Sequence, residues 1–142
     1  MSTASALVQI RCWCGAVRAE LSGEPVVQFY CHCDDCQTVH GAAYVGVALY
    51  PLDALRVTDG DLVASVYRTL PRERCARCAT QLFAKVNGQP LVGVKANLLP
   101  AGKFQPSFHI RCRHAVLPVV DSLPHYRDVP PEFGGDGERV GW

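Results

Sequence analysis

The sequence lacks any run of basic residues and any long apolar segment. Lysine and arginine number 14, against 13 aspartate and glutamate residues, so the formal charge is only +1. A chain without a basic patch has little to attract the phosphates of a nucleic acid or an anionic membrane surface, which argues against both as main partners. No segment approaches the roughly 18 uninterrupted apolar residues of a membrane-spanning helix.

The sequence also lacks the pattern of a secretory leader. The N-terminal stretch MSTASALVQI has no basic region ahead of an apolar one, so we expect a cytoplasmic protein. In a reducing cytosol clustered cysteines more often bind metal or do redox chemistry than form disulfides, although a disulfide set stays open. Neither a repeat nor a linker divides the 142 residues, a length that fits one domain.

Strand signals dominate what is present, and they predict a mainly β fold with at most short helical turns. Alternating or β-branched runs predict strands at 7–12, 16–21, 26–30, 42–50 and 108–120. The first two would form a hairpin with Cys-Trp-Cys-Gly at its tip. Asp59-Gly60 and Asn87-Gly88 each predict a further hairpin.

One short helix and one irregular tail complete the expected elements. The stretch CDDCQTVHG predicts a helix that Asp34 or Asp35 caps and Gly41 ends. Residues 127–142 are rich in proline and glycine and predict either an arm across the domain or a disordered tail.

Eight cysteines stand out, and seven of them fall into three close groups. A structural zinc ion takes four ligands in a tetrahedron, most often as two close pairs on two turns. The C-x-C and C-x-x-C pairs provide such a closed set, composed of Cys12, Cys14, Cys75 and Cys78. Metal bound there would clamp the first hairpin to the middle of the chain and contribute to folding.

The remaining group, Cys31, Cys33 and Cys36, offers three thiolates and no fourth cysteine nearby. Three protein ligands and one open position are typical of a zinc ion that binds water or a substrate. Cys33 and Cys36 would share one face of the short helix, whose N-terminus favours thiolates. The prediction is therefore two zinc ions per chain, one enclosed and one open.

Other uses of these residues stay open. The second site could be a structural zinc completed by His32, His40 or a late histidine, or could hold an iron-sulfur cluster. Cys75 and Cys78 could form a redox pair, although no βαβ pattern surrounds them. His32 is interpreted first as a packing residue or as a neighbour of the ligands, because its ring points away from them in an extended segment. Cys112 is typical of a small core residue.

Taken in order, the motifs resemble those of the glutathione-dependent formaldehyde-activating enzyme family, which includes the centromere protein V relatives. The resemblance spans residues 8–126. It rests on C-x-C-G, C-H-C-x-x-C and C-x-x-C, followed by a late H-I and D-x-L-P, and the residues that carry the late motifs are His109, Ile110, Asp121, Leu123 and Pro124.

The resemblance implies a β-tent fold with two zinc ions per chain. It places the structural zinc on Cys12, Cys14, Cys75 and Cys78, and the catalytic zinc on Cys31, Cys33 and Cys36. The implied activity is of the carbon-sulfur lyase type, in which the thiol of glutathione adds to formaldehyde to give S-(hydroxymethyl)glutathione.

Several positions depart from the family pattern. Arg74 stands where an aromatic residue is common and Ala79 where glycine is common, while Leu117 lies near an expected tryptophan. Gln37 and Thr38 replace a frequent Arg-Lys pair that could have met the carboxylates of glutathione.

On the enzyme hypothesis, the open zinc positions a thiolate or polarises the aldehyde, and the thiolate role is favoured because three thiolates make zinc a weak Lewis acid. Arg77, Lys85 and Lys95 are candidates to meet an anionic substrate, or are solvated surface charges. The rival hypothesis is a non-catalytic two-zinc domain that binds a protein partner or carries a thiol ligand.

Overall fold

The computed structural model describes residues 7–142, so residues 1–6, part of the stretch on which the expectation about a secretory leader rests, lie outside it. Its elements in chain order are β1 (Val8–Arg11), β2 (Arg18–Leu21), β3 (Val27–Cys31), α1 (Asp34–His40), β4 (Val45–Pro51), η1 (Leu52–Ala54), β5 (Leu55–Asp59), β6 (Leu62–Val66), β7 (Pro71–Cys75), β8 (Gln81–Lys85), β9 (Leu91–Lys95), η2 (Ala96–Leu98), β10 (Phe108–Ile110), η3 (Cys112–His114) and η4 (Pro131–Phe133), where η denotes a 3₁₀ helix.

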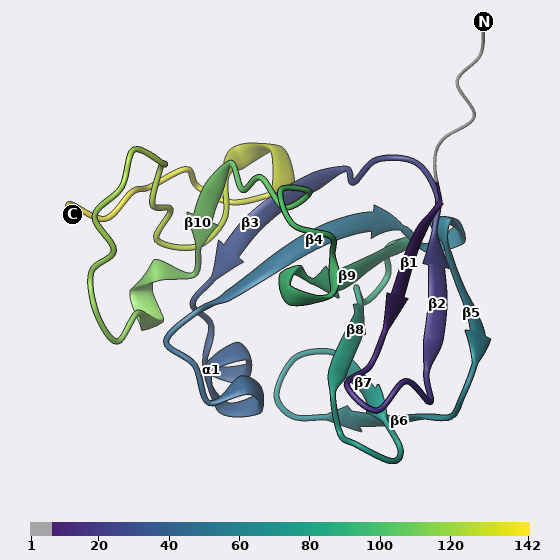
Figure 1. The fold of residues 1–142 in the computed structure, drawn as a ribbon. Helices are drawn as coiled ribbons and strands as arrows, with labels where there is room; N and C mark the ends of the chain where they lie inside the picture. The colour runs from purple at the N-terminus through teal and green to yellow at the C-terminus, as the bar shows by residue number, and fades with distance from the viewer. Residues whose placement is uncertain (1–6) are drawn as a thin grey trace, which may run out of the picture.

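Two sheets hold these strands, which confirms the mainly β prediction. The smaller sheet has the order β1-β2-β5 and the larger one β10-β3-β4-β9-β8-β7-β6. All of the strand pairs are antiparallel except β10 with β3. Figure 1 shows the small sheet at one end of the molecule and β10 at the other. No helix in the described part of the chain is long and apolar enough to cross a membrane.

Two of the predicted hairpins are present. Strands β1 and β2 pair antiparallel around the turn at Cys12–Gly15, where Gly15 takes φ +79°. Strands β8 and β9 pair antiparallel around the turn that holds Gly88 at φ +72°. Glycine reaches this left-handed region without the steric penalty of a side chain, which explains the local signal.

The hairpin predicted at Asp59-Gly60 is wrong. Strand β5 pairs with β2 in the small sheet, whereas β6 pairs with β7 in the large one. The turn between them packs closely against the first hairpin. A Cβ atom on Gly60 would lie 2.3 Å from the carbonyl oxygen of Ala16, so only glycine fits there. A turn signal locates the change of direction but does not say which strand each arm will pair with.

The predicted helix is present, but its cap differs from the prediction. Cys33, rather than Asp34 or Asp35, is the N-cap of α1, and its Sγ accepts a hydrogen bond from the Cys36 amide at 3.3 Å. Gly41 ends the helix at φ +57°, as predicted. The late strand is shorter than predicted, because Arg111 adopts φ +57° and turns the chain into η3 directly after β10.

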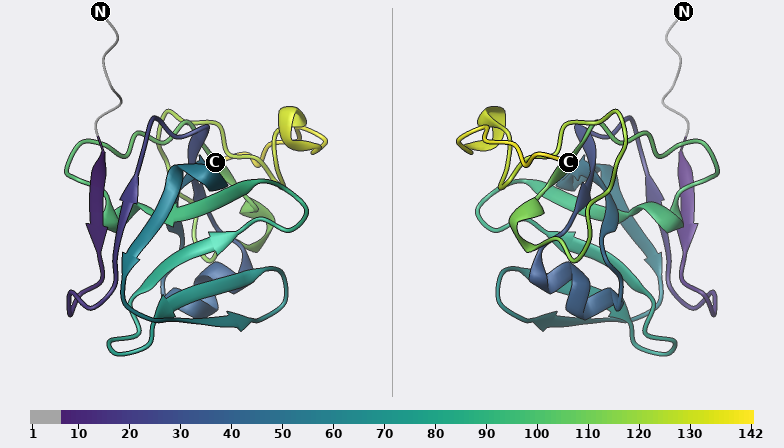
Figure 2. Two further views of the ribbon diagram at one scale, coloured as in Figure 1. Left: turned by 90° about the vertical axis from the view of Figure 1, so that its right-hand side faces the viewer. Right: turned by 90° about the vertical axis from the view of Figure 1, so that its left-hand side faces the viewer.

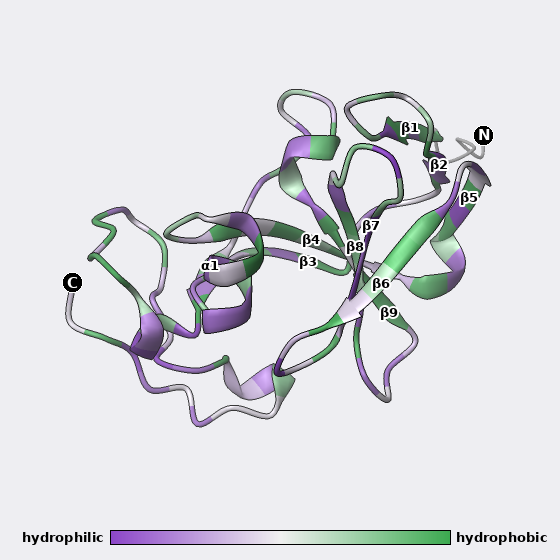
Figure 3. Cartoon of the chain, turned by 90° about the horizontal axis from the view of Figure 1, so that it is seen from below, coloured by the Kyte–Doolittle hydropathy of each residue, from purple (hydrophilic) through white to green (hydrophobic). Residues whose placement is uncertain are grey.

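The large sheet is covered on both faces. One face joins the small sheet in the main core, where Ala48, Tyr50, Val92 and Val94 pack with residues of the first hairpin. The opposite face of β4 carries Val47, which packs with Cys31 and Cys36 beside α1. Figure 3, seen from below, shows α1 over β3 and β4. Because successive side chains along a strand point to opposite faces, the same strands contribute to the main core on one face and to the three-cysteine cluster on the other.

The C-terminal segment lies against β10. His125 forms a bridge with His109, and Tyr126 forms one with Arg139. The ring of Phe108 on β10 contacts the rings of Tyr126 and Phe133. Figure 2 shows this segment on the side of the molecule away from the small sheet.

Candidate metal and active site

Four cysteines meet where the first hairpin contacts the turn after β7. Ligand atoms of Cys12, Cys14, Cys75 and Cys78 all lie within 4.8 Å of one another. The Sγ atom of Cys14 lies 3.6 Å from that of Cys12 and 3.9 Å from that of Cys75. A Zn–S bond of about 2.3 Å sets tetrahedral sulfurs about 3.8 Å apart, so this spacing fits a zinc ion.

Backbone amides support the same sulfurs. The amide of Val17 donates to Cys12 Sγ at 3.3 Å, and the amides of Arg77 and Cys78 donate to Cys75 Sγ at 3.3 and 3.4 Å. Hydrogen bonds from Thr80 and from the backbone lower the pKa of the Cys78 thiol to about 5. Donors directed at sulfur favour the thiolate form, which is the form that binds metal.

The turn that carries Cys75 and Cys78 contains a strained residue. Ala79 has φ +64°, in a region where a Cβ atom costs about 1 kcal/mol. We expect Ala79→Gly to raise the free energy of unfolding of the metal-loaded protein by about 0.5–1 kcal/mol, measured by urea denaturation. The matched control is Ala76→Gly in the same turn, where φ is not positive and glycine should lower stability. An equal loss in both variants would contradict the strain argument.

The second cysteine group gathers at the start of α1. Ligand atoms of Cys31, Cys33 and Cys36 lie within 4.8 Å of one another, and within residues 7–142 no histidine, aspartate or glutamate joins this group as a fourth ligand. Cys31 comes from the end of β3, Cys33 is the N-cap and Cys36 lies in the first turn of the helix. Hydrogen bonds from Cys31 and Cys36 hold the pKa of Cys33 well below its usual range, which favours the thiolate form that binds metal.

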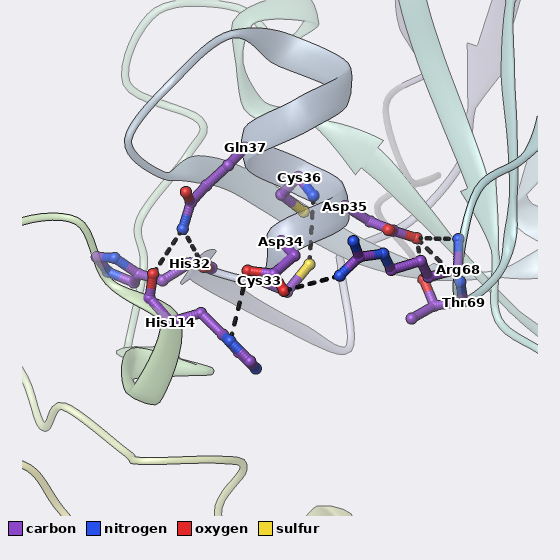
Figure 4. Close-up of polar contacts among 9 residues, drawn as sticks. All are labelled: His32, Cys33, Asp34, Asp35, Cys36, Gln37, Arg68, Thr69 and His114. Atoms are coloured by element: carbon purple, nitrogen blue, oxygen red, sulfur yellow. Dashed lines mark hydrogen bonds and ion pairs between the residues drawn. The ribbon is translucent and has the colours of Figure 1, made fainter.

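Polar contacts anchor the helix that carries these cysteines (Figure 4). The Gln37 amide donates to the carbonyl oxygens of His32 at 2.8 Å and His114 at 2.7 Å, which ties the helix to η3. Asp35 is buried, and its Oδ2 accepts from the amides of Arg68 and Thr69 and from the Thr69 hydroxyl, at 3.0, 2.9 and 2.8 Å. Gln37, one of the departures from the family pattern, therefore has a structural contact of its own.

A cavity of about 380 Å³ opens beside the three sulfurs, lined by Cys31, Cys33 and Cys36 and by apolar side chains that include Phe29, Val47 and Leu49. The register of the large sheet builds its floor. Arg72 lies opposite Ala84, and Ala84 opposite Gly93. The small residues in this row leave space between the sheet and α1. A larger groove, of about 820 Å³, follows β1 beside Cys12 and Trp13, but of the seven clustered cysteines it reaches only the buried Cys12.

Two buried cations line the cavity, Arg72 at 4 % exposed and Lys95 at 2 %. Arg72 Nη2 donates to the Sγ atoms of Cys36 at 3.5 Å and Cys33 at 3.9 Å. Burial alone would lower the pKa of Arg72, but the sulfurs of Cys36 and Cys33 outweigh it and the pKa is raised. For Lys95 burial prevails and lowers the pKa, although the cysteine thiolates act in the opposite direction.

Among the three cations considered from the sequence, only Lys95 lies at the cavity. Lys85 is exposed and pairs loosely with Glu73 at 3.9 Å, and Arg77 is exposed beside the four-cysteine cluster. Arg72 was missed, because PRERC reads as a polar stretch with no hydrophobic alternation. The C-x-x-C motif begins at the last residue of this stretch, and it indicated only that the stretch lies near a metal site.

A buried histidine chain explains the late family motifs. His32 Nε2 lies 2.9 Å from His109 Nδ1, and His109 Nε2 lies 2.8 Å from Asp121 Oδ2. His125 Nε2 lies 2.8 Å from the other oxygen of Asp121. Although His109, Asp121 and His125 lie close enough for a metal ion, His109 is hydrogen-bonded to both His32 and Asp121. His125 Nε2 has no hydrogen-bond partner among the described residues. The ring of His32 is thus engaged with His109, and Cys112, whose pKa burial raises to about 12, is a separate buried residue.

Asp121 gives the fold a defined response to acid. Burial alone would raise its pKa, but hydrogen bonds from His109 and Leu123 lower it below the ordinary 3.8. A depressed carboxyl pKa contributes stability that is complete above the unfolded value and is lost as pH falls through the folded value. We expect Asp121→Asn to lower stability at pH 7 and to flatten the loss of stability below about pH 4. Thermal unfolding across pH tests this, with the exposed Asp53→Asn as a control that should keep the wild-type profile.

The fold and the site define a mainly β protein with two cysteine clusters, each of which could hold a metal ion. The chain belongs to the glutathione-dependent formaldehyde-activating enzyme family, whose model matches residues 7–114. The resemblance inferred from the motifs is thereby confirmed. A crystal structure of a Rhodobacter sphaeroides protein is similar, with 26 % identity and a TM-score of 0.54 over 66 % of this chain and 88 % of that chain. No curated protein sequence matches.

Proposed function

We propose that the protein adds a small thiol, such as glutathione, to formaldehyde or a related small carbonyl compound, at the cavity beside Cys31, Cys33 and Cys36. The single observation that carries the proposal is the three-cysteine group, which has no fourth ligand in the described chain and faces a cavity of about 380 Å³. Membership of the family supports the reaction type. The activity would be that of a carbon-sulfur lyase, and the two-sheet arrangement would be the family's β-tent fold.

The residues fit two zinc ions of different kinds. Cys12, Cys14, Cys75 and Cys78 would enclose the structural ion, and the spacing of their sulfurs supports this assignment. Cys31, Cys33 and Cys36 would hold the second ion. Zinc bound there would offer one open position that favours the thiolate form of an incoming thiol or polarises a carbonyl oxygen.

The chain's own residues would bind and orient the reactants. Phe29, Val47 and Leu49 exclude water from one side of the cavity, which strengthens electrostatic interactions inside it. The ammonium group of Lys95 favours a negatively charged sulfur nearby. Most of the rate effect would come from holding two small molecules together.

The test compares thiol addition with and without the protein, since the reaction also proceeds uncatalysed. Exchange of formaldehyde between hydrate and thiol adduct is measured by NMR with glutathione and with 2-mercaptoethanol. We expect an exchange rate that rises in proportion to metal-loaded protein and returns to the buffer value for Cys33→Ser. A rate equal to that of buffer containing the same zinc concentration excludes the proposal. Cys112→Ser is the matched control, because Cys112 lies in neither cluster.

A further inference from the structure

Arg72 has an unusual set of hydrogen-bond acceptors. Its guanidinium group is buried, and its only hydrogen bonds in the described chain go from Nη2 to the sulfurs of Cys36 and Cys33. The Nε and Nη1 atoms have no partner among the described residues. A buried guanidinium normally pairs with a carboxylate, so this arrangement calls for a physical reason.

The nearest acidic side chain does not provide that reason. Burial would raise the pKa of Asp35, and hydrogen bonds from Thr69 and Arg68 lower it, with a further contribution from the charge of Arg72. No ion pair within 4.0 Å joins Asp35 to Arg72 among residues 7–142. The Oδ2 atom of Asp35 instead accepts three hydrogen bonds from Arg68 and Thr69. The sulfurs are therefore the acceptors that hold the guanidinium in place.

A hydrogen bond to a thiolate lowers the basicity and the nucleophilicity of the sulfur. The donor shares the sulfur lone pair, so the thiolate becomes less basic and a weaker nucleophile, while it still binds metal. In the proposed reaction this matters, because formaldehyde enters a cavity that already holds three protein sulfurs. Each of them competes with the substrate thiolate for the same carbonyl carbon.

We propose that Arg72 is a positioning and protecting residue, which suppresses the nucleophilicity of Cys33 and Cys36 so that formaldehyde reacts with the incoming thiol and not with the protein. This inference rests on the proposed function only in naming the electrophile. The hydrogen bonds lower the nucleophilicity of the two sulfurs toward any electrophile that enters the cavity.

The suppressed side reaction is a simple addition. A sulfur lone pair of Cys33 or Cys36 forms the new C–S bond, the C=O π pair moves to oxygen, and the resulting alkoxide takes a proton from water. The product is an S-hydroxymethyl cysteine. The productive addition has the same balance, with the substrate sulfur in place of the protein sulfur.

The experiment measures how fast the protein's own sulfurs react. Zinc-loaded wild type, Arg72→Gln and Arg72→Met are treated with iodoacetamide and, separately, with formaldehyde, and the modified cysteines are identified by peptide mass spectrometry. We expect alkylation of Cys33 and Cys36 to be about tenfold faster in Arg72→Gln, which is the effect of losing one charge-assisted hydrogen bond. The cysteines of the four-cysteine cluster should react at the wild-type rate.

A second readout is spectroscopic. In the cobalt-substituted protein, loss of the hydrogen bonds should shift the sulfur-to-cobalt charge-transfer absorption to lower energy. The matched control is Arg74→Gln on the same strand, because Arg74 donates to Ser65 at 2.7 Å and not to a cysteine. Its alkylation rates and its cobalt spectrum should equal those of wild type.

The outcomes separate this inference from the proposed function. Equal alkylation rates and equal cobalt spectra in wild type and Arg72→Gln, at equal metal content, overturn the role of Arg72 even if the enzyme is active. Faster alkylation in a protein that does not accelerate thiol addition supports Arg72 and excludes the proposed reaction. If Arg72→Gln does not fold, Arg72→Met decides, since methionine packs in an apolar site and donates no hydrogen bond to sulfur. Wild-type alkylation in that variant then overturns the proposal.

Discussion

Replacement of Cys75 by serine is expected to prevent folding, whereas replacement of Cys33 by serine is expected to leave the fold intact. A structural zinc site contributes about 10–16 kcal/mol of apparent binding free energy, and a domain is stable by only about 5–15 kcal/mol in total. Cys75 is 1 % exposed in the main core and joins β7 to the first hairpin. Loss of that site would therefore exceed the stability available.

Cys33 differs because its cluster lies outside the main core, at the start of α1. Serine is a good N-cap residue, so Cys33→Ser keeps the hydrogen bond from the Cys36 amide while it removes one thiolate. We expect folded protein with about one zinc ion per chain instead of about two. Circular dichroism and metal analysis of both variants measure this difference.

Two results would contradict the division into one enclosed and one open site. If both variants unfold alike, the three-cysteine group is structural and the non-catalytic hypothesis of a two-zinc domain gains support. If wild-type protein purified without chelators holds no more than one tightly bound ion, the second site is not a metal site. The buried Cys112→Ser variant controls for loss of a thiol in general.

Replacement of Lys95 by methionine is expected to reduce kcat/KM for thiol addition by about 100-fold, the lower end of the effect of removing one preorganised electrostatic group beside the reacting atoms. Lys95 is 2 % exposed and lines the cavity with the three cysteines. Within the described residues it pairs with no carboxylate, and the charges that act on it are those of Arg72 and of the cysteine thiolates that line the same cavity. Methionine keeps the length of the side chain and removes a buried charge, so the melting temperature should not fall.

Lys85→Met is the matched control for this prediction. Lys85 ends the neighbouring strand β8, but its side chain is 54 % exposed and points away from the cavity residues, toward Glu73. Its kinetic constants should equal those of wild type. A Lys95→Met enzyme with unchanged kcat/KM would show that the buried ammonium group only packs against the cavity wall.

Short-range patterns predicted most of the fold. Alternating or β-branched runs located strands close to β1, β2, β3 and β4, the Asn87-Gly88 turn located the hairpin of β8 and β9, and Gly41 ended the helix as expected. The errors arose where the outcome depended on distant partners. Asp59-Gly60 was assigned to a hairpin because the local turn signal is the same whether the two strands pair with each other or with strands of different sheets.

In the candidate site, too, the features set by residues close in sequence were predicted and those set by distant contacts were not. The three cysteine groups could be recognised from their spacing alone, because metal ligands separated by one or two residues reach a common point through local geometry. The late histidine and aspartate were noticed only as motif residues. The contact of His32 with His109, 77 residues away, became visible once β10 paired with β3.

The sequence by itself determined how the sulfurs are grouped, where the chain turns, and which family the protein resembles, because each of these depends on residues that are neighbours along the chain. Only the tertiary structure decided that Arg72 and Lys95 are buried beside Cys33 and Cys36. Side chains alternate between the two faces of a sheet, so the positions of Arg72 in β7 and Lys95 in β9 do not by themselves say which face each side chain lies on. The order of the strands and the position of α1 select the face, and both are set by packing between distant parts of the chain.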